Sequence, residues 1–408
     1  MAGPLQGIVV LDLSRILAGP WATQVLADYG AEVLKVEHPQ GGDDTRKWGP
    51  PYLKDAAGEE TRESAYYLSA NRGKRSLAID FSQSDGQELI RQLATRADVL
   101  VENFKVGGLA RQGLGYKQLA VLNPRLVYLS ISAFGQDGPD AAKPGYDAMI
   151  QGMGGLMSLT GVADGEPGAG PQKVGVAVAD LMCGMYAVSA ILAALFERDR
   201  SGQGQYIDLS LLDTQVAWLA NQAMNYLVTG RPPTRKGTAH PNIVPYQAFA
   251  TADGDLMLAV GNDAQFQRFC RAAGAAGLAA DARFATNAER VAHRGTLVPA
   301  VEALLRLRTT AEWLAVLAAA QVPCGPINDL AQVFAEPQVR HRGLRFELPH
   351  PTAGQMPGVR NPVRFGRTPI EYDRSPPLLG ADTATELKHR LGLDERALAD
   401  LAARGIIA

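Results

Sequence analysis

Cysteine is scarce in this sequence of 408 residues. Its three cysteines, Cys183, Cys270 and Cys324, are far apart and odd in number. Such a set does not form a disulfide framework and is typical of a reducing compartment. A nucleophilic cysteine stays open as an alternative, although a buried and inert thiol is the more ordinary interpretation. The six histidines show no metal-ligand spacing, so we predict no metal site.

Excess charge and long hydrophobic runs are also missing. The sequence has 40 lysines and arginines against 42 aspartates and glutamates, a net charge of −2. This balance favours neither nucleic acid nor an anionic membrane as a partner. The longest apolar run, residues 181–196, is too short and too rich in small residues to predict a membrane span, so we expect a core helix there. The amino-terminal stretch lacks the pattern of a signal peptide, and we therefore expect a cytoplasmic protein.

Several nucleotide-binding and catalytic motifs are absent. The first turn between a predicted strand and helix reads "SRILAGPW" and contains no G-x-G-x-x-G, which argues against an enzyme that uses NAD or FAD. The sequence contains neither a Walker A motif nor a G-x-S-x-G elbow.

Strand and helix patterns alternate in the first third of the chain. "GIVVLDLS" is an apolar run typical of a strand covered on both faces, "GPWATQVLADYG" predicts a helix, and "AEVLKVE" predicts the next strand. "GQELIRQLATRA", "DVLVENF" and "RLVYLSISAFG" continue as helix, strand and strand. This order predicts an α/β protein with a Rossmann-like, mostly parallel and doubly wound sheet.

A second domain is expected later in the chain. The Pro-rich segment "TGRPPTRKGTAHPNIVP" predicts a loop, "YQAFATADGDLMLAVG" a hairpin with a D-G turn, and helical patterns follow to about residue 320. We therefore expect a smaller α+β domain at residues 226–325, between residues 1–225 and a tail at 326–408. In the tail, "RFELPH" and "GVRNPVRF" predict short strands and "TATELKHRLG" a helix.

One carboxylate, Asp180, stands in the apolar stretch "VGVAVADLMCGMYAV". Burial of an isolated carboxylate costs several kcal/mol or raises its pKa. A strand-like "VGVAVA" followed at once by a helix makes Asp180 a candidate N-cap. Alternatively, the carboxylate lies where open α/β sheets place their ligands, and the helix N-terminus keeps it ionised as a nucleophile or base. The residues alone leave both interpretations open.

Basic residues and one histidine stand in loops near predicted strand ends. The loops "DDTRKWGPP", "NRGKRS" and "VENFKVGGLARQG" contain Arg46, Lys47, Lys74, Arg75 and Arg111. These residues either hold a phosphorylated ligand or form solvated loops. His240, in "KGTAHPNIVPYQ", is either a substrate contact or an exposed, backbone-bonded histidine.

Taken together, a set of segments resembles the class III CoA-transferase family, which includes formyl-CoA:oxalate and carnitine CoA-transferases. The segments are "LDLSRILAGPWATQVLADYGAEVLKVE", "DDTRKWGPP", "NRGKRS", "VENF", "GVAVADL" and "PPLLGADT", and they follow the family order along the whole chain. "GDDTRKWGPP", "GTAHPNIVPYQAF", "VPCGPIND" and "VFAEPQV" are similar to the succinyl-CoA:dicarboxylate branch, with glutarate-type enzymes. The resemblance implies CoA thioesters as substrates rather than tightly bound cofactors.

The resemblance also implies roles for individual residues. Asp180 corresponds to the nucleophile, which forms an aspartyl anhydride and then an aspartyl-CoA thioester. The implied CoA contacts are Leu17, Ala18, His38, Asn71, Arg72, Gly73, Lys74, Asn103, Phe104, Lys105, Arg111, Tyr146 and Asp147. We expect Arg46 and His240 to be candidates for binding the remote carboxylate of a dicarboxylate such as glutarate, itaconate or mesaconate.

Departures from the family pattern narrow the implied activity. Formyl-CoA enzymes have a glutamine where this sequence has Leu17, and an apolar Leu17 cannot hydrogen-bond a small polar acyl group, which argues against formate or oxalate as substrate. They have an arginine where this sequence has His38, so we expect the ionic role of this residue to depend on pH. The family also contains 2-methylacyl-CoA racemases, whose histidine base is replaced here by Tyr146, a poor base at pH 7. Racemase activity and a non-catalytic CoA-binding role stay as alternatives. The fold implied is an interlocked homodimer whose large domain combines residues 1–225 with the tail.

Overall fold

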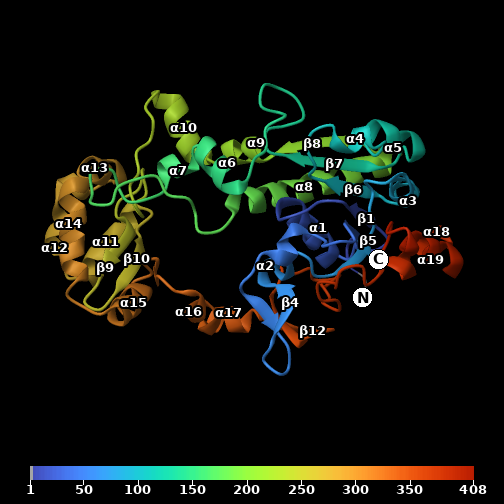
Figure 1. Cartoon of the computed structure of the whole chain (residues 1–408). Helices are drawn as coiled ribbons and strands as arrows, with labels where there is room; N and C mark the ends of the chain where they lie inside the picture. The colour runs from blue at the N-terminus through green and yellow to red at the C-terminus, as the bar shows by residue number, and fades with distance from the viewer. Residues whose placement is uncertain (1–2) are drawn as a thin grey trace. The chain divides into compact units, whose positions relative to one another are not determined.

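The structure, a computed structural model, describes residues 3–408 and divides into two compact units (Figure 1). The first unit comprises residues up to 156, 173–231 and 340–408, and the second comprises residues 157–172 and 232–339. The chain passes between the two units at four points. Two of them, after residues 231 and 339, lie later than the expected domain boundaries after residues 225 and 325. The segment 157–172, which the sequence assigns to the large domain, belongs to the second unit.

A six-stranded sheet forms the centre of the first unit, and every neighbouring pair in it is parallel. Its strands are β1 (Val9–Asp12), β2 (Glu32–Glu37), β5 (Lys74–Ala78), β6 (Val99–Glu102), β7 (Val127–Ser132) and β8 (Tyr206–Ser210), in the order β5-β2-β1-β6-β7-β8. From β1 the chain adds strands on one side, and from β6 it adds them on the other. The prediction of a doubly wound parallel sheet is confirmed, with its switch point between β1 and β6.

Helices cover both faces of this sheet. Val10 and Leu11 point to opposite faces of β1 and belong to two separate hydrophobic cores. On the face of Val10 lie α1 (Ala18–Asp28) and α8 (Val178–Ser201). On the face of Leu11 lie α3 (Ser84–Ala94), α5 (Tyr116–Leu122), α18 (Thr383–Leu391) and α19 (Glu395–Ala403). Figure 1 shows α18 beside the edge strand β5.

Shorter elements complete the first unit. They are η1 (Asp44–Lys47), β3 (Tyr52–Lys54), β4 (Glu60–Ser64), α2 (Ala65–Ser69), α4 (Gly108–Arg111), α6 (Asp147–Met153), α9 (Leu211–Ala217), α10 (Ala220–Thr229), β12 (Arg345–His350) and β13 (Gly354–Val359). β3 pairs with β4, and β12 pairs with β13, both antiparallel. Two expectations were wrong. Residues 174–177 form no strand before α8, and the second tail strand is β13 rather than residues 358–365.

Among residues 3–408, α8 is the helix that is long and apolar enough to cross a membrane by length and composition. Its Ala187 and Ile191 are fully buried in the core that α8 shares with α1 and the sheet. The apolar sequence of α8 therefore serves the protein interior, which confirms the expectation of a core helix.

The second unit contains a three-stranded antiparallel sheet and a group of helices. Its strands are β9 (Tyr246–Ala250), β10 (Asp255–Ala259) and β11 (Cys324–Pro326), in the order β11-β10-β9. Its helices are α11 (Asp263–Ala272), α12 (Ala276–Ala280), η2 (Ala282–Phe284), α13 (Asn287–Ala292), α14 (Arg294–Leu305), α15 (Thr310–Ala319) and α16 (Leu330–Ala335). Two short helices, α7 (Leu156–Leu159) and α17 (Pro337–His341), lie at two of the points where the chain passes between the units. The predicted hairpin is β9–β10.

The core of the first unit gives a stability prediction. Leu100 of β6 is fully buried between β1 and β7, so Leu100→Ala leaves a cavity. We expect the free energy of unfolding to fall by about 2–5 kcal/mol in urea titrations followed by circular dichroism. The matched control is Leu122→Ala, because Leu122 is 48% exposed and its loss should change stability by about 0.5 kcal/mol. Equal losses in both variants would contradict the assigned core.

Candidate active site

A cavity of about 390 Å³ opens at the carboxyl ends of β1 and β6, at the switch point where the order of strand addition reverses. The turn after β1 contributes Leu17 and Ala18, and the turn after β6 contributes Asn103, Phe104 and Lys105. Arg111, Tyr146 and Asp180 complete the set of predicted residues on its wall. Open α/β sheets place their ligands at this position, because two loops diverge there and leave a crevice.

Asp180 is the third residue of α8 rather than its N-cap, so the N-cap interpretation is wrong. Ala177 occupies the N-cap position and makes no side-chain cap. The side chain that caps α8 is that of Asp147, the first residue of α6. Its Oδ1 accepts hydrogen bonds from the backbone N–H groups of Ala179 (2.8 Å) and Asp180 (3.4 Å). The side chain of Asp180 is thereby left for other contacts.

The carboxylate of Asp180 is half-buried, and no hydrogen bond or ion pair to it forms within residues 3–408. Burial, with a smaller contribution from the negative charge of Asp147, raises the pKa of Asp180 to about 7. A carboxylate without donors is a stronger nucleophile than one in a salt bridge. One turn away, burial raises the pKa of the Cys183 thiol to about 12, so this cysteine is neutral at pH 7 and ill suited to attack.

Sequence analysis missed three residues near this carboxylate. Tyr66 is close enough to Asp180 for their charges to interact. Burial, and then the negative charge of Asp180, raises the pKa of the Tyr66 phenol. Arg15 and Lys143 line the cavity and pair with acidic residues, Arg15 with Asp44 (3.0 Å) and Lys143 with Asp140 (2.6 Å). The signal for Arg15 was present, since it follows a predicted strand in "LDLSR" at the ligand-binding edge.

A second cavity, of about 230 Å³, shares Arg15 and Phe104 with the first. His38 lies on its wall, and its Nε2 is 3.7 Å from Asp80 Oδ1. Phe81 packs edge-on against Phe104 with ring centroids 5.6 Å apart. Because Arg15 and Phe104 line both cavities, the cavities are adjacent. A long ligand can therefore extend from the aromatic side chains near His38 towards Asp180.

The "NRGKRS" segment is placed differently from the other predicted contacts. Asn71, Arg72 and Lys74 are buried, and they do not line either cavity. Lys74 Nζ donates to Asp12 Oδ2 (3.1 Å), to the Pro20 carbonyl (2.9 Å) and to Asn71 Oδ1 (2.9 Å), which uses its three hydrogens. Arg72 pairs with Asp28, and Gly73 provides a positive φ of 76°. A direct CoA contact there would have to replace these bonds.

The two candidates for the remote carboxylate have other partners in this structure. The Arg46 guanidinium donates to Glu37 at 2.7 and 2.8 Å and to the Tyr67 hydroxyl at 2.6 Å. It is therefore already neutralised. His240 belongs to the second unit, where it stacks on Tyr246, and its Nδ1 accepts from the Asn242 backbone N–H. A substrate contact from His240 stays a prediction.

A ligand cavity at the switch point of a parallel α/β sheet, with an unpaired carboxylate at a helix start, is typical of an enzyme that uses covalent catalysis. Residues 5–383 match the family described as CoA-transferase family III. This chain therefore belongs to that family and is a CoA-transferase whose substrates are CoA thioesters.

Individual relatives agree with this membership. The chain is 52% identical to succinate–glutarate CoA-transferase of Agrobacterium fabrum over 384 residues, which cover 94% of this chain and 95% of that protein. It is 42% identical to succinyl-CoA:glutarate CoA-transferase of Homo sapiens, with coverage of 99% and 90%. A crystal structure of a CAIB/BAIF family protein from Brucella suis matches with a TM-score of 0.83 and 47% identity, covering 96% of this chain and all of that one.

The pKa of Asp180 gives a prediction about activity and pH. The free enzyme should be inactive when Asp180 is protonated, so kcat/KM should fall about tenfold per pH unit below pH 7 and level off above it. Asp147→Asn removes the neighbouring charge while an amide oxygen can still accept from α8, so the acidic limb should move to lower pH. Initial rates between pH 5 and 9 measure both curves. A profile flat from pH 5 to 8 would contradict the assignment.

Proposed function

We propose that this CoA-transferase moves coenzyme A from succinyl-CoA to glutarate or a dicarboxylate of similar length, through covalent intermediates on Asp180. The position of Asp180 carries the proposal. Its carboxylate lies on the wall of the cavity at the sheet switch point, and no donor within residues 3–408 binds it. The relatives from Agrobacterium fabrum and Homo sapiens, whose names include succinate or succinyl-CoA and glutarate, support the substrate pair.

The reaction divides into exchanges of similar energy. A carboxylate oxygen of Asp180 attacks the thioester carbonyl of succinyl-CoA, the carbon–sulfur bond breaks, and a mixed anhydride and the CoA thiolate form. The thiolate attacks the aspartyl carbonyl and releases succinate, which leaves an aspartyl-CoA thioester. The acceptor carboxylate then attacks the aspartyl carbonyl of this thioester, which breaks the carbon–sulfur bond and forms a second mixed anhydride and the CoA thiolate. The thiolate attacks the acceptor's carbonyl in this anhydride, which releases the new acyl-CoA and regenerates the Asp180 carboxylate. Covalent catalysis thereby replaces one difficult exchange with easier ones.

The two cavities suggest how CoA is oriented. Aromatic side chains suit an adenine ring, so we place the nucleotide end beside His38, Phe81 and Phe104. The thioester end then lies in the larger cavity with Asp180. Cations between these ends, Arg15, Lys105 and Arg111, suit the phosphates. Arg46 is buried against Glu37, whereas Lys143 lines the larger cavity and its ion pair with Asp140 is exposed. The remote carboxylate is therefore better served by Lys143.

The substrate proposal predicts the products of a defined assay. Purified enzyme with succinyl-CoA should form glutaryl-CoA and succinate in equal amounts, with itaconate and mesaconate as slower or equal acceptors and monocarboxylates of the same length as poor ones. Mass spectrometry of the acyl-CoA esters measures this. Asp180→Asn should lower kcat by at least about 10³-fold with an unchanged circular dichroism spectrum. Absence of exchange with every acid, or deuterium exchange at the α-carbon of a 2-methylacyl-CoA without an acceptor, would overturn the proposal.

We also propose that the protein is a cytoplasmic homodimer. A group of large apolar side chains on α8, α9 and α10 is exposed, namely Met185, Tyr186, Phe196, Val216, Met224, Tyr226, Leu227 and Val228. Large apolar side chains that are exposed on neighbouring helices are typical of an interface between subunits.

The assembly proposal predicts a mass. Sedimentation equilibrium should give about twice the 43.5 kDa of one chain. Leu227→Asp, at a position 70% exposed, should shift the protein towards the monomer. Leu307→Asp is the control, because Leu307 is similarly exposed, at 74%, but lies in the second unit. A wild-type protein that sediments as a monomer would contradict the dimer.

A further inference from the structure

The turn between β1 and α1 has an unfavourable backbone conformation. Ile16 has a φ of 71°, in the left-handed region that β-branched residues rarely adopt. Ile16 also lines the larger cavity, directly before Leu17 and Ala18. Strained backbone persists only where the surrounding structure holds it, and it is concentrated at functional sites. The question is therefore which groups hold Ile16.

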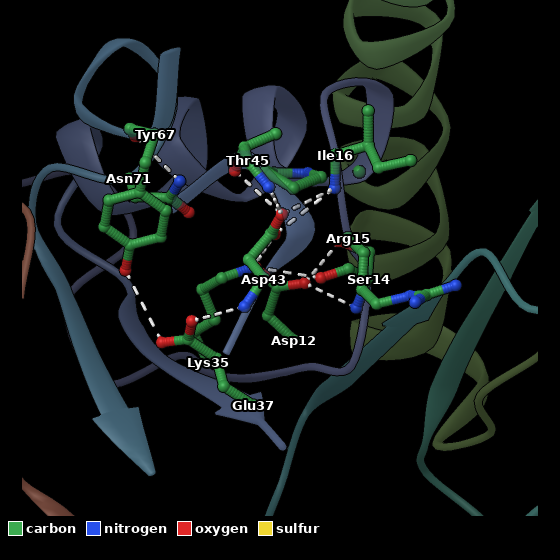
Figure 2. Close-up of polar contacts among 12 residues, drawn as sticks. Asp12, Ser14, Arg15, Ile16, Lys35, Glu37, Asp43, Thr45, Tyr67 and Asn71 are labelled. Atoms are coloured by element: carbon green, nitrogen blue, oxygen red, sulfur yellow. Dashed lines mark hydrogen bonds and ion pairs between the residues drawn. The ribbon is translucent and has the colours of Figure 1, made fainter. Parts of the chain in front are cut away.

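A buried carboxylate holds the turn from one side. Both oxygens of Asp43 accept from the backbone N–H of Ile16, each at 3.2 Å. Asp43 is itself fixed by the backbone N–H and the hydroxyl of Thr45, at 3.0 and 2.7 Å. Figure 2 shows Asp43 between Ile16 and Thr45, with its carboxylate directed at the turn. Only 1% of the surface of Asp43 is exposed, so water does not compete for these bonds.

A buried lysine holds both this carboxylate and the other side of the turn. Lys35 Nζ donates to Asp43 Oδ2 at 2.9 Å and to the carbonyl of Ser14 at 3.0 Å. Burial alone would lower the pKa of Lys35, but the charges of Asp43 and Asp12 raise it. Lys35 in turn helps to lower the pKa of Asp43 to about 2, against the effect of burial. The pair therefore stays ionised across the working range of the enzyme.

The clamped turn leads directly into the site. Lys35 holds the carbonyl of Ser14, and Asp43 holds the backbone N–H of Ile16. Leu17 follows at the N-cap position, without a side-chain cap, and α1 begins at Ala18. Leu17 and Ala18 share the cavity wall with Asp180. A displacement of about 1 Å at such a wall can reduce a rate by about 10²-fold, because reacting groups lose their alignment.

We propose that Asp43 is a positioning residue for acyl transfer: fixed by Lys35, it holds Ile16 in its strained conformation and so sets the wall formed by Leu17 and Ala18 beside Asp180. This inference rests on the proposed role of Asp180 and adds a residue that does not touch the reacting atoms. Asp43 also lies on the wall of the smaller cavity, but its carboxylate oxygens already bind Ile16, Thr45 and Lys35. It assigns a function to the first half of "GDDTRKWGPP" that differs from ligand binding.

The test combines two substitutions. Asp43→Asn keeps the size of the side chain but removes the charge that holds Ile16 and Lys35, and we expect kcat to fall by about 10–100-fold. The Kd of CoA, from calorimetry, should change less than about threefold, because most predicted CoA contacts lie elsewhere. Glycine adopts a positive φ without support, so Asp43→Asn should cost at least about tenfold less in an Ile16→Gly background. Ile16→Gly alone provides the reference for this comparison.

A matched control separates positioning from general loss of stability. Glu386→Gln likewise removes the charge of a buried carboxylate, which in α18 pairs with Arg390. Glu386 does not line the larger cavity, so this variant should leave kcat unchanged. If Asp43→Asn does not fold, Thr45→Val decides the question, because it removes one bond to Asp43 and should lower kcat by about two- to fivefold. Unchanged kcat in that variant, or an equal loss from Asp43→Asn in both backgrounds, would overturn the proposal. An inactive wild-type enzyme would instead refute the proposed function.

Discussion

Lys35 and Asp43 form an ion pair that is closed to solvent. Asp12 of β1 and Glu37 of β2 lie near this pair (Figure 2). Transfer of two such charges out of water costs several kcal/mol for each ion, so the pair is tolerated only because further hydrogen bonds satisfy it. Asp12 of β1 pairs with Lys74 of β5, and Glu37 of β2 pairs with Arg46. These bonds tie the carboxyl ends of β1 and β2 to the start of β5 and to η1, and the turn after β1 forms part of the wall of the larger cavity.

Two carboxylates at this edge of the sheet, Asp43 and Asp180, have opposite properties. Asp43 receives donors from Lys35, Ile16 and Thr45, and its pKa falls to about 2, so it is a permanent structural charge. Asp180 receives none within residues 3–408, and its pKa rises to about 7. The difference lies in the supply of N–H and O–H groups rather than in burial alone. The donors around Asp43 are all used within its own hydrogen-bond network. They therefore do not form salt bridges with Asp180, whose carboxylate stays available for attack.

Much of the fold could be predicted because its signals are local. The apolar run "GIVVLDLS" and the helix after it predict β1 and α1, and the order of such patterns predicts a parallel sheet. The position of Asp180 on the ligand-binding side also followed from pattern and resemblance. Capping could not be predicted, because the cap of α8 comes from Asp147, more than 30 residues earlier in the chain. For the same reason the sequence did not distinguish Lys74 and Arg46, which bind buried acids, from Lys105, which lines the cavity.

The first unit is assembled from segments at both ends of the chain. The backbone N–H of Asp80 donates to the carbonyl of Ile406, and that of Ala408 donates to Ala78. Leu387, Leu398 and Leu401 complete the core on the Leu11 face of the sheet. During synthesis on the ribosome, α3 and α5 can cover part of this face early, but the part that α18 and α19 cover stays exposed until residues 383–403 have emerged. A chain cut before residue 383 therefore leaves apolar side chains of the sheet open to aggregation.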